Sequence, residues 1–317
     1  MIEPRLFLCS GAMVADDDPI RDGRRAVCLD SFGPHENVNI RIQDVAKILL
    51  TDLSPRLVDL LEIATYVFCA DTGTRRGTQW TDDASTEPWA RDFHFVIPVR
   101  DLEFWRQSEV QRLLVQILKF LADDNYRFDF RQLHHDRPKQ HYLEFDHGWD
   151  DWPFHTVDRV IMFSGGLDSL AGAAQTAKSG ENLVLVSHRP VTTIGKRQRE
   201  LFKELQKTYP VQMVHVPVWS NKETILNREP SQRTRSFLFT ALGTLVGHSI
   251  GSKGVRFFEN GVVSLNLPIA DEVLRARASR TTHPWALRLL TQLLTLVTGR
   301  DFIADNPFVT MTKTEVV

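Results

Sequence analysis

The 317-residue sequence predicts an α/β protein in which a parallel sheet with helices on both faces is preceded by a smaller α+β domain. After residue 150, apolar strand-like runs alternate with helical segments, a rhythm typical of a parallel sheet. The first half mixes strand-like and helical patterns without that rhythm, and polar and aromatic residues crowd residues 141–153. We therefore predict domains over residues 1–150 and 151–317.

In the first half, alternating apolar residues indicate half-buried strands. These strands are expected at residues 38–42, 93–99 and 128–130. Ser54 and Pro55 have the residue types of an N-cap and a first helical position, so they predict a helix whose apolar face reaches Phe68. A second amphipathic helix is expected over residues 108–123.

The second half is predicted to alternate between strands and helices. The expected strands are residues 157–163, 183–187, 212–218, 255–259 and 302–304. The expected helices are residues 168–178, 196–208, 235–250 and 284–297.

The composition indicates a soluble globular protein. Basic and acidic residues nearly cancel, 38 against 40, so nothing in the net charge of −2 favours nucleic acid or a charged membrane surface as a partner. The N-terminus has no signal-peptide pattern, and the apolar run over residues 237–250 is too short to span a bilayer. We expect a cytoplasmic protein without a membrane partner.

The three cysteines, Cys9, Cys28 and Cys69, show no CxxC pairing and have apolar neighbours. This pattern favours buried thiols over disulfides or a zinc site. No cysteine follows Cys69, so we expect no thiol nucleophile in the second half. The histidines at positions 134, 135, 141 and 147 have the spacing of no known ligand motif.

Residues 164–169, SGGLDS, stand where the first strand of the second half becomes a helix. Ligands of parallel α/β sheets bind beyond the carboxyl ends of the strands, and a helix N-terminus attracts anions. Gly165 and Gly166 would let the backbone approach a phosphate, and Ser164 and Ser169 would add hydroxyl donors. Asp168 would repel a bare phosphate, which suggests Mg²⁺ between them. A helix-capping role for Asp168, or a plain turn, are the alternatives.

SGGLDS is neither a Walker A loop nor a dinucleotide fingerprint. It resembles the PP-loop, SGGxDS, of the ATP pyrophosphatases with a HUP-type fold. The resemblance implies that residues 164–169, including Leu167, hold the ATP pyrophosphate with Mg²⁺ on Asp168. It also implies that AMP is joined to a carbonyl or carboxylate oxygen before a nucleophile displaces it. His188 and Arg189 end the second strand, and the resemblance makes them a wall of the ATP pocket.

Two further stretches resemble QueC-like enzymes. NPFVTMTKTEVV, residues 306–317, is similar to their segment in which a proline precedes K-x-E-[IV]. RTRSFLF, ENGVVSLNLPIADEV and SRTTHP, within residues 233–283, resemble the QatC-type QueC-like proteins of bacterial anti-phage systems. QueC converts 7-carboxy-7-deazaguanine to the 7-cyano compound with ATP and ammonia. Its four-cysteine zinc site lies beyond this point and has no counterpart here, so zinc is not expected.

Arg233 and Arg235 precede an apolar helix, where the helix dipole disfavours cations. This placement suggests an anion shared with the SGGLDS loop, although solvated arginines are the alternative. The resemblance implies that Lys313 meets a phosphate or the adenylated intermediate; as a bare feature it could be an exposed lysine. Asp168, Arg235 and Lys313 are the candidate catalytic residues.

Two segments are candidates for substrate contact. Asn260 and Gly261 form a turn at a strand end, and a plain turn is the alternative. Residues 279–284 concentrate hydrogen-bond donors before a helix, with Pro284 at its expected start. The candidates in this segment are Arg280, Thr281, Thr282 and His283, although Thr282 or His283 could instead serve as the helix cap.

Thr312 and Glu315 form a capping box for a helix that is cut off at Val317, so the domain is expected to continue further. The leading hypothesis is an ATP-dependent enzyme that adenylates a carboxylate, such as 7-carboxy-7-deazaguanine or one on a protein partner, for attack by an amine or ammonia. We expect a role in anti-phage defence, with residues 1–150 facing other subunits. A non-catalytic ATP sensor or scaffold and a tRNA-modifying enzyme are the alternatives.

Overall fold

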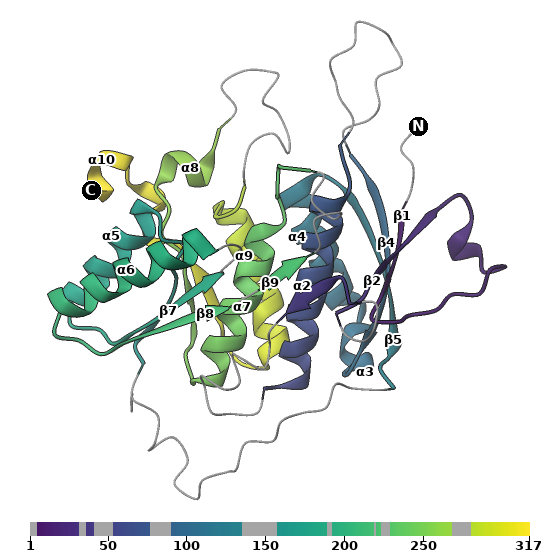
Figure 1. Cartoon of the computed structure of the whole chain (residues 1–317), viewed down its shortest axis with the longest axis horizontal. Coiled ribbons are helices and arrows are strands. Elements are labelled where there is room, and N and C mark those ends of the chain that lie inside the picture. Colours follow the sequence, from purple (N-terminus) through teal and green to yellow (C-terminus); the bar gives the residue numbers. More distant parts are fainter. Residues whose placement is uncertain are drawn as a thin grey trace, which may run out of the picture.

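Two parallel sheets organise the chain in the computed structural model (Figure 1). The described residues are 5–31, 36–40, 53–76, 90–134, 157–188, 192–218, 220–222, 229–267 and 280–317. The strands are β1 (Arg5–Cys9), β2 (Arg25–Leu29), β3 (Val38–Ile40), β4 (Asp92–Val99), β5 (Asn125–Gln132), β6 (Arg159–Met162), β7 (Leu183–His188), β8 (Met213–Val218), β9 (Ser220–Lys222), β10 (Gly254–Arg256) and β11 (Ile303–Asp305).

The helices follow most of the predicted segments. They are α2 (Pro55–Gly73), α3 (Leu102–Trp105), α4 (Ser108–Ala122), α5 (Leu167–Lys178), α6 (Thr192–Thr208), α7 (Arg235–Ser249), α8 (Gly261–Leu265), α9 (Pro284–Thr298) and α10 (Lys313–Val316), with 3-10 turns η1 (Pro19–Arg21) and η6 (Pro307–Thr310). The predicted starts at Pro55 and Pro284 are confirmed, because proline at the first helical position has the φ angle that a helix needs.

The second half contains the predicted parallel sheet, in the order β11-β10-β6-β7-β8. Helices α5 and α6 pack on one face, and α7 and α9 cover the other, so the predicted fold class is confirmed. In the first half, expected as α+β, the sheet β2-β1-β4-β5 is parallel as well. The helices α2 and α4 lie in the connections that lead to β4 and β5, whereas β1 reaches its parallel neighbour β2 through residues 10–24, which include the turn η1.

The two halves share one core. Helices α2 and α4 pack on the first sheet, and they also contact α7 and α9, which pack on the second. Figure 1 shows these four long helices between the two sheets. One hydrophobic cluster therefore extends from Phe95 of β4 through Leu245 of α7 to Val184 of β7. The expected domain boundary, at residues 141–153, lies outside the described residues.

Cys9 and Cys69 are buried as predicted, but the prediction for Cys28 is wrong, because its side chain is exposed. Cys28 lies on β2, which is the edge strand of the first sheet among the described strands. Within the described ranges no group of three or more histidine, cysteine, aspartate or glutamate side chains could hold a metal ion. His134 is exposed, and the other three histidines near it lie outside those ranges. No described helix is long and apolar enough to cross a membrane.

A buried cluster of four charged side chains ties the first half to the start of α7. Arg91 contacts Asp71 at 2.5 Å and Asp124 at 2.6 Å, and Arg76 contacts the same two carboxylates at 3.3 and 3.0 Å. Asp71 also accepts hydrogen bonds from the backbone N–H (2.9 Å) and the hydroxyl (3.1 Å) of Thr234. Burial alone would raise the pKa of Asp71, but the two guanidinium groups and Thr234 hold it below its ordinary value.

Removing one charge from this cluster should be costly. We expect Arg91→Met to lower the free energy of unfolding by about 3–5 kcal/mol, because two buried carboxylates lose a partner. The matched control is Arg112→Met, which removes an exposed arginine paired with Glu109 at 3.8 Å and should cost less than about 1 kcal/mol. Urea unfolding of the three proteins measures both values, and equal losses would contradict a stabilising role for the cluster.

Candidate functional site

The SGGLDS loop forms the predicted strand-to-helix turn at the carboxyl end of β6. Gly165 has φ +79°, a conformation that residues with a side chain rarely adopt, and a Cβ atom there would lie 3.0 Å from Cγ of Gln198. The Ser164 hydroxyl lies 3.1 Å from that of Ser169 and accepts the Gly166 N–H at 3.2 Å. Gln198 donates to the Ser164 carbonyl at 3.2 Å. These contacts hold the loop in one shape.

The N-terminus of α5 is open. Its N-cap is Gly166, and no side chain in the described part of the chain caps the first turn. Leu167, the first residue of α5, is 46% exposed. The first-turn N–H groups therefore point from the loop toward any anion that approaches it.

Asp168 does not cap α5, so the capping alternative is wrong. Its carboxylate accepts hydrogen bonds from the backbone N–H of Asn260 at 3.1 Å and from the Asn260 side-chain amide at 2.8 Å. The Lys313 ammonium donates to the other carboxylate oxygen. Burial would raise the pKa of Asp168, but the lysine and the two N–H donors outweigh it and hold the pKa below its ordinary value.

The Mg²⁺ that the family resemblance implies fits this place chemically. A cationic group, the Lys313 ammonium, already contacts Asp168 here, and α5 begins beside it. Mg²⁺ binds proteins through one or two carboxylates and completes its shell with phosphate oxygens and water. Asp168 would be its protein ligand.

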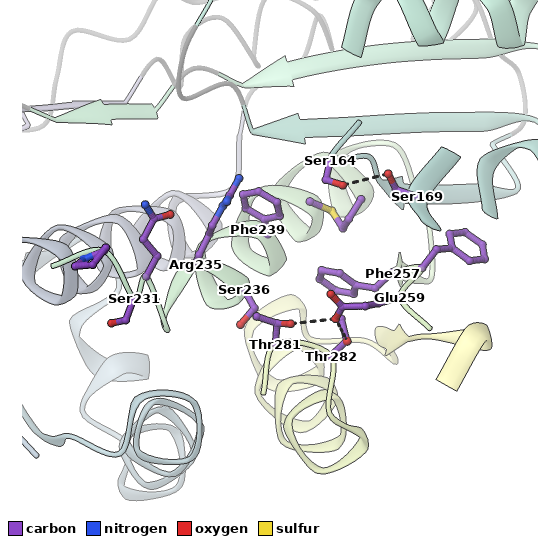
Figure 2. A pocket seen from close by; sticks show the side chains of 14 residues that line it. Ser164, Ser169, Ser231, Arg235, Ser236, Phe239, Phe257, Glu259, Thr281 and Thr282 are labelled. Atoms are coloured by element: carbon purple, nitrogen blue, oxygen red, sulfur yellow. Dashed lines mark hydrogen bonds between the residues drawn. The ribbon is translucent and has the colours of Figure 1, made fainter. Parts of the chain in front are cut away.

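A cavity of about 470 Å³ opens beside the loop and holds five of the predicted site residues. They are Ser164, Ser169, Arg235, Thr281 and Thr282. Figure 2 shows Arg235, Ser236 and Phe239 of α7 together on one wall, and Glu259 beside Thr281 and Thr282 on another. The fold thus brings together candidate residues that are more than 100 positions apart in the sequence.

Arg235, the first residue of α7, places its positive charge at the lining of this cavity. Its guanidinium lies 4.9 Å from the centre of the Phe239 ring and makes no hydrogen bond or ion pair within the described part of the chain. Burial lowers the pKa of this group from its ordinary value, and no carboxylate opposes the shift. The next residue, Ser236, is only 4% exposed, and its hydroxyl has no partner among the described residues.

Glu259 is a cavity residue that the sequence reasoning missed. Its carboxylate accepts hydrogen bonds from the Thr281 hydroxyl at 3.1 Å and from the Thr282 hydroxyl. Glu259 comes three residues after β10, and the rule that ligands bind beyond strand ends could have found it. The two threonines are expected substrate contacts, and in the structure they bind Glu259.

Asn260 and Gly261 form a tight turn outside the cavity lining. Besides binding Asp168, Asn260 accepts the Val263 N–H at 3.2 Å and so caps α8. A Cβ atom on Gly261 would lie 2.3 Å from the Val309 carbonyl oxygen, and its N–H donates to the Met311 carbonyl at 2.7 Å. This geometry explains both residue types without a substrate.

Arg280 and His283 also lie outside the cavity lining. Arg280 donates to the Phe120 carbonyl of α4 at 2.9 Å, and its guanidinium lies 5.0 Å from the Phe120 ring centre. His283 accepts the Trp285 N–H at 3.1 Å as the N-cap of α9, as the capping alternative expected. Burial, with the nearby Arg280, lowers the pKa of His283.

The remaining predicted residues surround this site. Arg233 lies two residues before Arg235, and burial, with the nearby Arg76, lowers its pKa. His188 ends β7 and is 3% exposed, with its ring centre 5.3 Å from that of Phe239. His188 therefore packs against Phe239, which lines the cavity. Arg189 lies outside the described residues.

Comparisons with known proteins leave the family open. No protein-family model matches the chain, and no curated protein matches it. Among solved structures, it is similar to a ketoreductase domain from the bacillaene assembly line, with 8% identity over 96% of this chain and 81% of that one. The TM-score of 0.25 is too low to carry any inference about fold or function.

Gly165 should be intolerant of a side chain for two reasons that can be separated. Gly180 has a similar φ of +85°, but a Cβ atom there meets nothing within 4 Å. We expect Gly180→Ala to cost about 1–2 kcal/mol from the left-handed backbone alone. Gly165→Ala should cost more, because its methyl group also presses on Gln198. Denaturant unfolding measures both, and equal costs would show that the contact with Gln198 is unimportant.

The Asp168 cluster should respond to pH. Because the folded-state pKa of Asp168 is lowered, its stabilising contribution is full above the unfolded-state pKa of about 3.9 and is lost as pH falls through the folded-state pKa. We expect the stability difference between wild type and Asp168→Asn to be largest above about pH 5 and to shrink below about pH 4. In a Lys313→Met background this pH dependence should weaken. A stability difference between wild type and Asp168→Asn that does not change with pH would contradict a lowered pKa of Asp168 in the folded protein.

Proposed function

We propose that this protein is an ATP-dependent adenylating enzyme whose SGGLDS loop binds the pyrophosphate part of ATP. The observation that carries the proposal is the Arg235 guanidinium, which has no hydrogen-bond or ion-pair partner among the described residues, in a cavity that begins at a glycine loop and a helix N-terminus. A half-buried cation without a partner is unfavourable unless an anion binds to it. ATP supplies such an anion, in a cavity of suitable size.

The phosphate side of the site would be built by three elements. The Gly165 amide and the first turn of α5 would bind phosphate oxygens, because N–H groups at a helix N-terminus attract anions. The Gly166 N–H, which donates to the Ser164 hydroxyl at 3.2 Å, would join them by exchanging that partner for a phosphate oxygen. Lys313 would move from Asp168 to a phosphate. When bound there, Mg²⁺ would neutralise part of the phosphate charge and leave Asp168 as its ligand.

The reaction we propose has two balanced steps. A carboxylate oxygen of the acceptor forms a bond to the α-phosphorus of ATP while the bond to the β-phosphate oxygen breaks, releasing pyrophosphate. An amine or ammonia then bonds to the acyl carbon, loses a proton, and displaces AMP. The loop amides and Lys313 would stabilise charge on the leaving pyrophosphate, and Arg235 would pair with the α-phosphate.

The resemblance of residues 233–283 to QueC-like proteins makes a carboxylated 7-deazaguanine the first acceptor to test. The cavity supports a planar acceptor of this kind, since Phe239 and Phe257 line it together with Glu259 and Ser236. A carboxylate on a partner protein is the second acceptor to test.

The proposal is tested by titrating Mg²⁺·ATP into wild type, Arg235→Met and the control Arg288→Met. Arg288 lies on α9 beside Trp285 and outside the cavity lining. We expect Arg235→Met to weaken ATP binding about 10- to 100-fold, because a charged hydrogen bond is lost, and Arg288→Met to leave it unchanged.

Mass spectrometry of the same mixtures, with each acceptor added, detects AMP and pyrophosphate. Their formation by wild type would support the enzyme, and binding without AMP would favour the ATP sensor. No binding by wild type would overturn the proposal altogether.

A further inference from the structure

The side chain of Asn306 uses both its donor and its acceptor at the junction of three segments. It follows β11 and is 7% exposed. Its oxygen accepts the backbone N–H groups of Glu259 at 3.1 Å and Phe308 at 3.2 Å. Its amide nitrogen donates to the Glu259 carbonyl and to the Ser264 hydroxyl, each at 2.8 Å. One side chain therefore joins the residues after β10, the helix α8 and the residues after β11.

The first consequence concerns the cavity wall. Because Asn306 binds both the N–H and the carbonyl of Glu259, it fixes the backbone from which the Glu259 carboxylate reaches Thr281 and Thr282. The Ser264 hydroxyl lies 3.0 Å from the Thr282 hydroxyl, so the same amide also supports Thr282 from the other side.

The second consequence concerns Lys313. Asn306 caps η6, which brings Phe308 against Phe258 with ring centres 4.7 Å apart. The Met311 carbonyl then accepts the Gly261 N–H at 2.7 Å, and two residues later Lys313 reaches Asp168. The chain from Asn306 to Lys313 is thus held at its start, its middle and its end.

We propose that Asn306 is a positioning residue. It holds Glu259 in the cavity wall and Lys313 at the phosphate site in fixed positions relative to each other. The inference rests on the proposed function, since it assigns Lys313 to phosphate. Asparagine is required because a carboxylate has no N–H to donate to the Glu259 carbonyl and Ser264, and an alkyl side chain has neither a donor nor an acceptor. Losing these bonds would leave buried backbone groups unpaired.

A double-mutant cycle on Mg²⁺·ATP affinity tests this role. The proteins are wild type, Asn306→Ala, Lys313→Met and the double variant. If Asn306 acts by placing Lys313, each single variant should weaken binding about tenfold, and the double variant should bind no more weakly than Lys313→Met alone. If Asn306→Ala instead weakened binding only through a general loss of structure, the fold losses in affinity of the two single variants would multiply in the double variant.

Asn182→Ala is the matched control. Asn182 accepts the Gln212 N–H at 3.2 Å at the amino edge of the same sheet, away from the site. We expect it to lower the melting temperature without changing ATP affinity. If Asn306→Ala does not fold, Asn306→Asp takes its place in the cycle, because it keeps the acceptor and removes both donors.

The outcomes separate the two proposals. If wild type binds Mg²⁺·ATP and the fold losses in affinity multiply, or if Asn306→Ala binds as tightly as wild type, the role of Asn306 is overturned. The proposed function then still stands. Wild type that does not bind Mg²⁺·ATP overturns the proposed function, and the role of Asn306 falls with it.

Discussion

The cluster of Arg76 and Arg91 with Asp71 and Asp124 is the constraint on which the site depends. Charges removed from water must be paired, so these four side chains bring the end of α2, the residues before β4 and the end of α4 to one point. Asp71 also binds Thr234, the residue before α7. The buried charged cluster therefore fixes the position at which α7, the helix that carries Arg235, begins.

The buried and half-buried arginines differ in their partners among the described residues. Arg76 and Arg91 are saturated by carboxylates, whereas the Arg235 guanidinium has an aromatic face beside it and no anion within the described residues. The neighbouring Ser236 hydroxyl is buried and unsatisfied in the same part of the chain. Unpaired buried polar groups cost stability, so their presence together in one cavity supports a ligand that completes them.

Opposite Arg235, the site depends on contacts between segments that are far apart in sequence. Asp168 at the start of α5 binds Asn260 and Lys313, which come 92 and 145 positions later. Asn306 connects the segments that carry these two partners. The Asp168 cluster and the Glu259 wall of the cavity are thus parts of one hydrogen-bonded unit.

The sequence by itself determined the local features. Helix starts at Pro55 and Pro284, the strand rhythm of the second half and the loop at residues 164–169 follow from turn chemistry and periodicity within about ten residues. Only the tertiary structure decided which candidates share a cavity. It placed Thr281 and Thr282 there with the unpredicted Glu259, and assigned His283 to a helix cap. It also decided that the first sheet is parallel. Such features depend on pairings between distant segments, and no local pattern of residues encodes them.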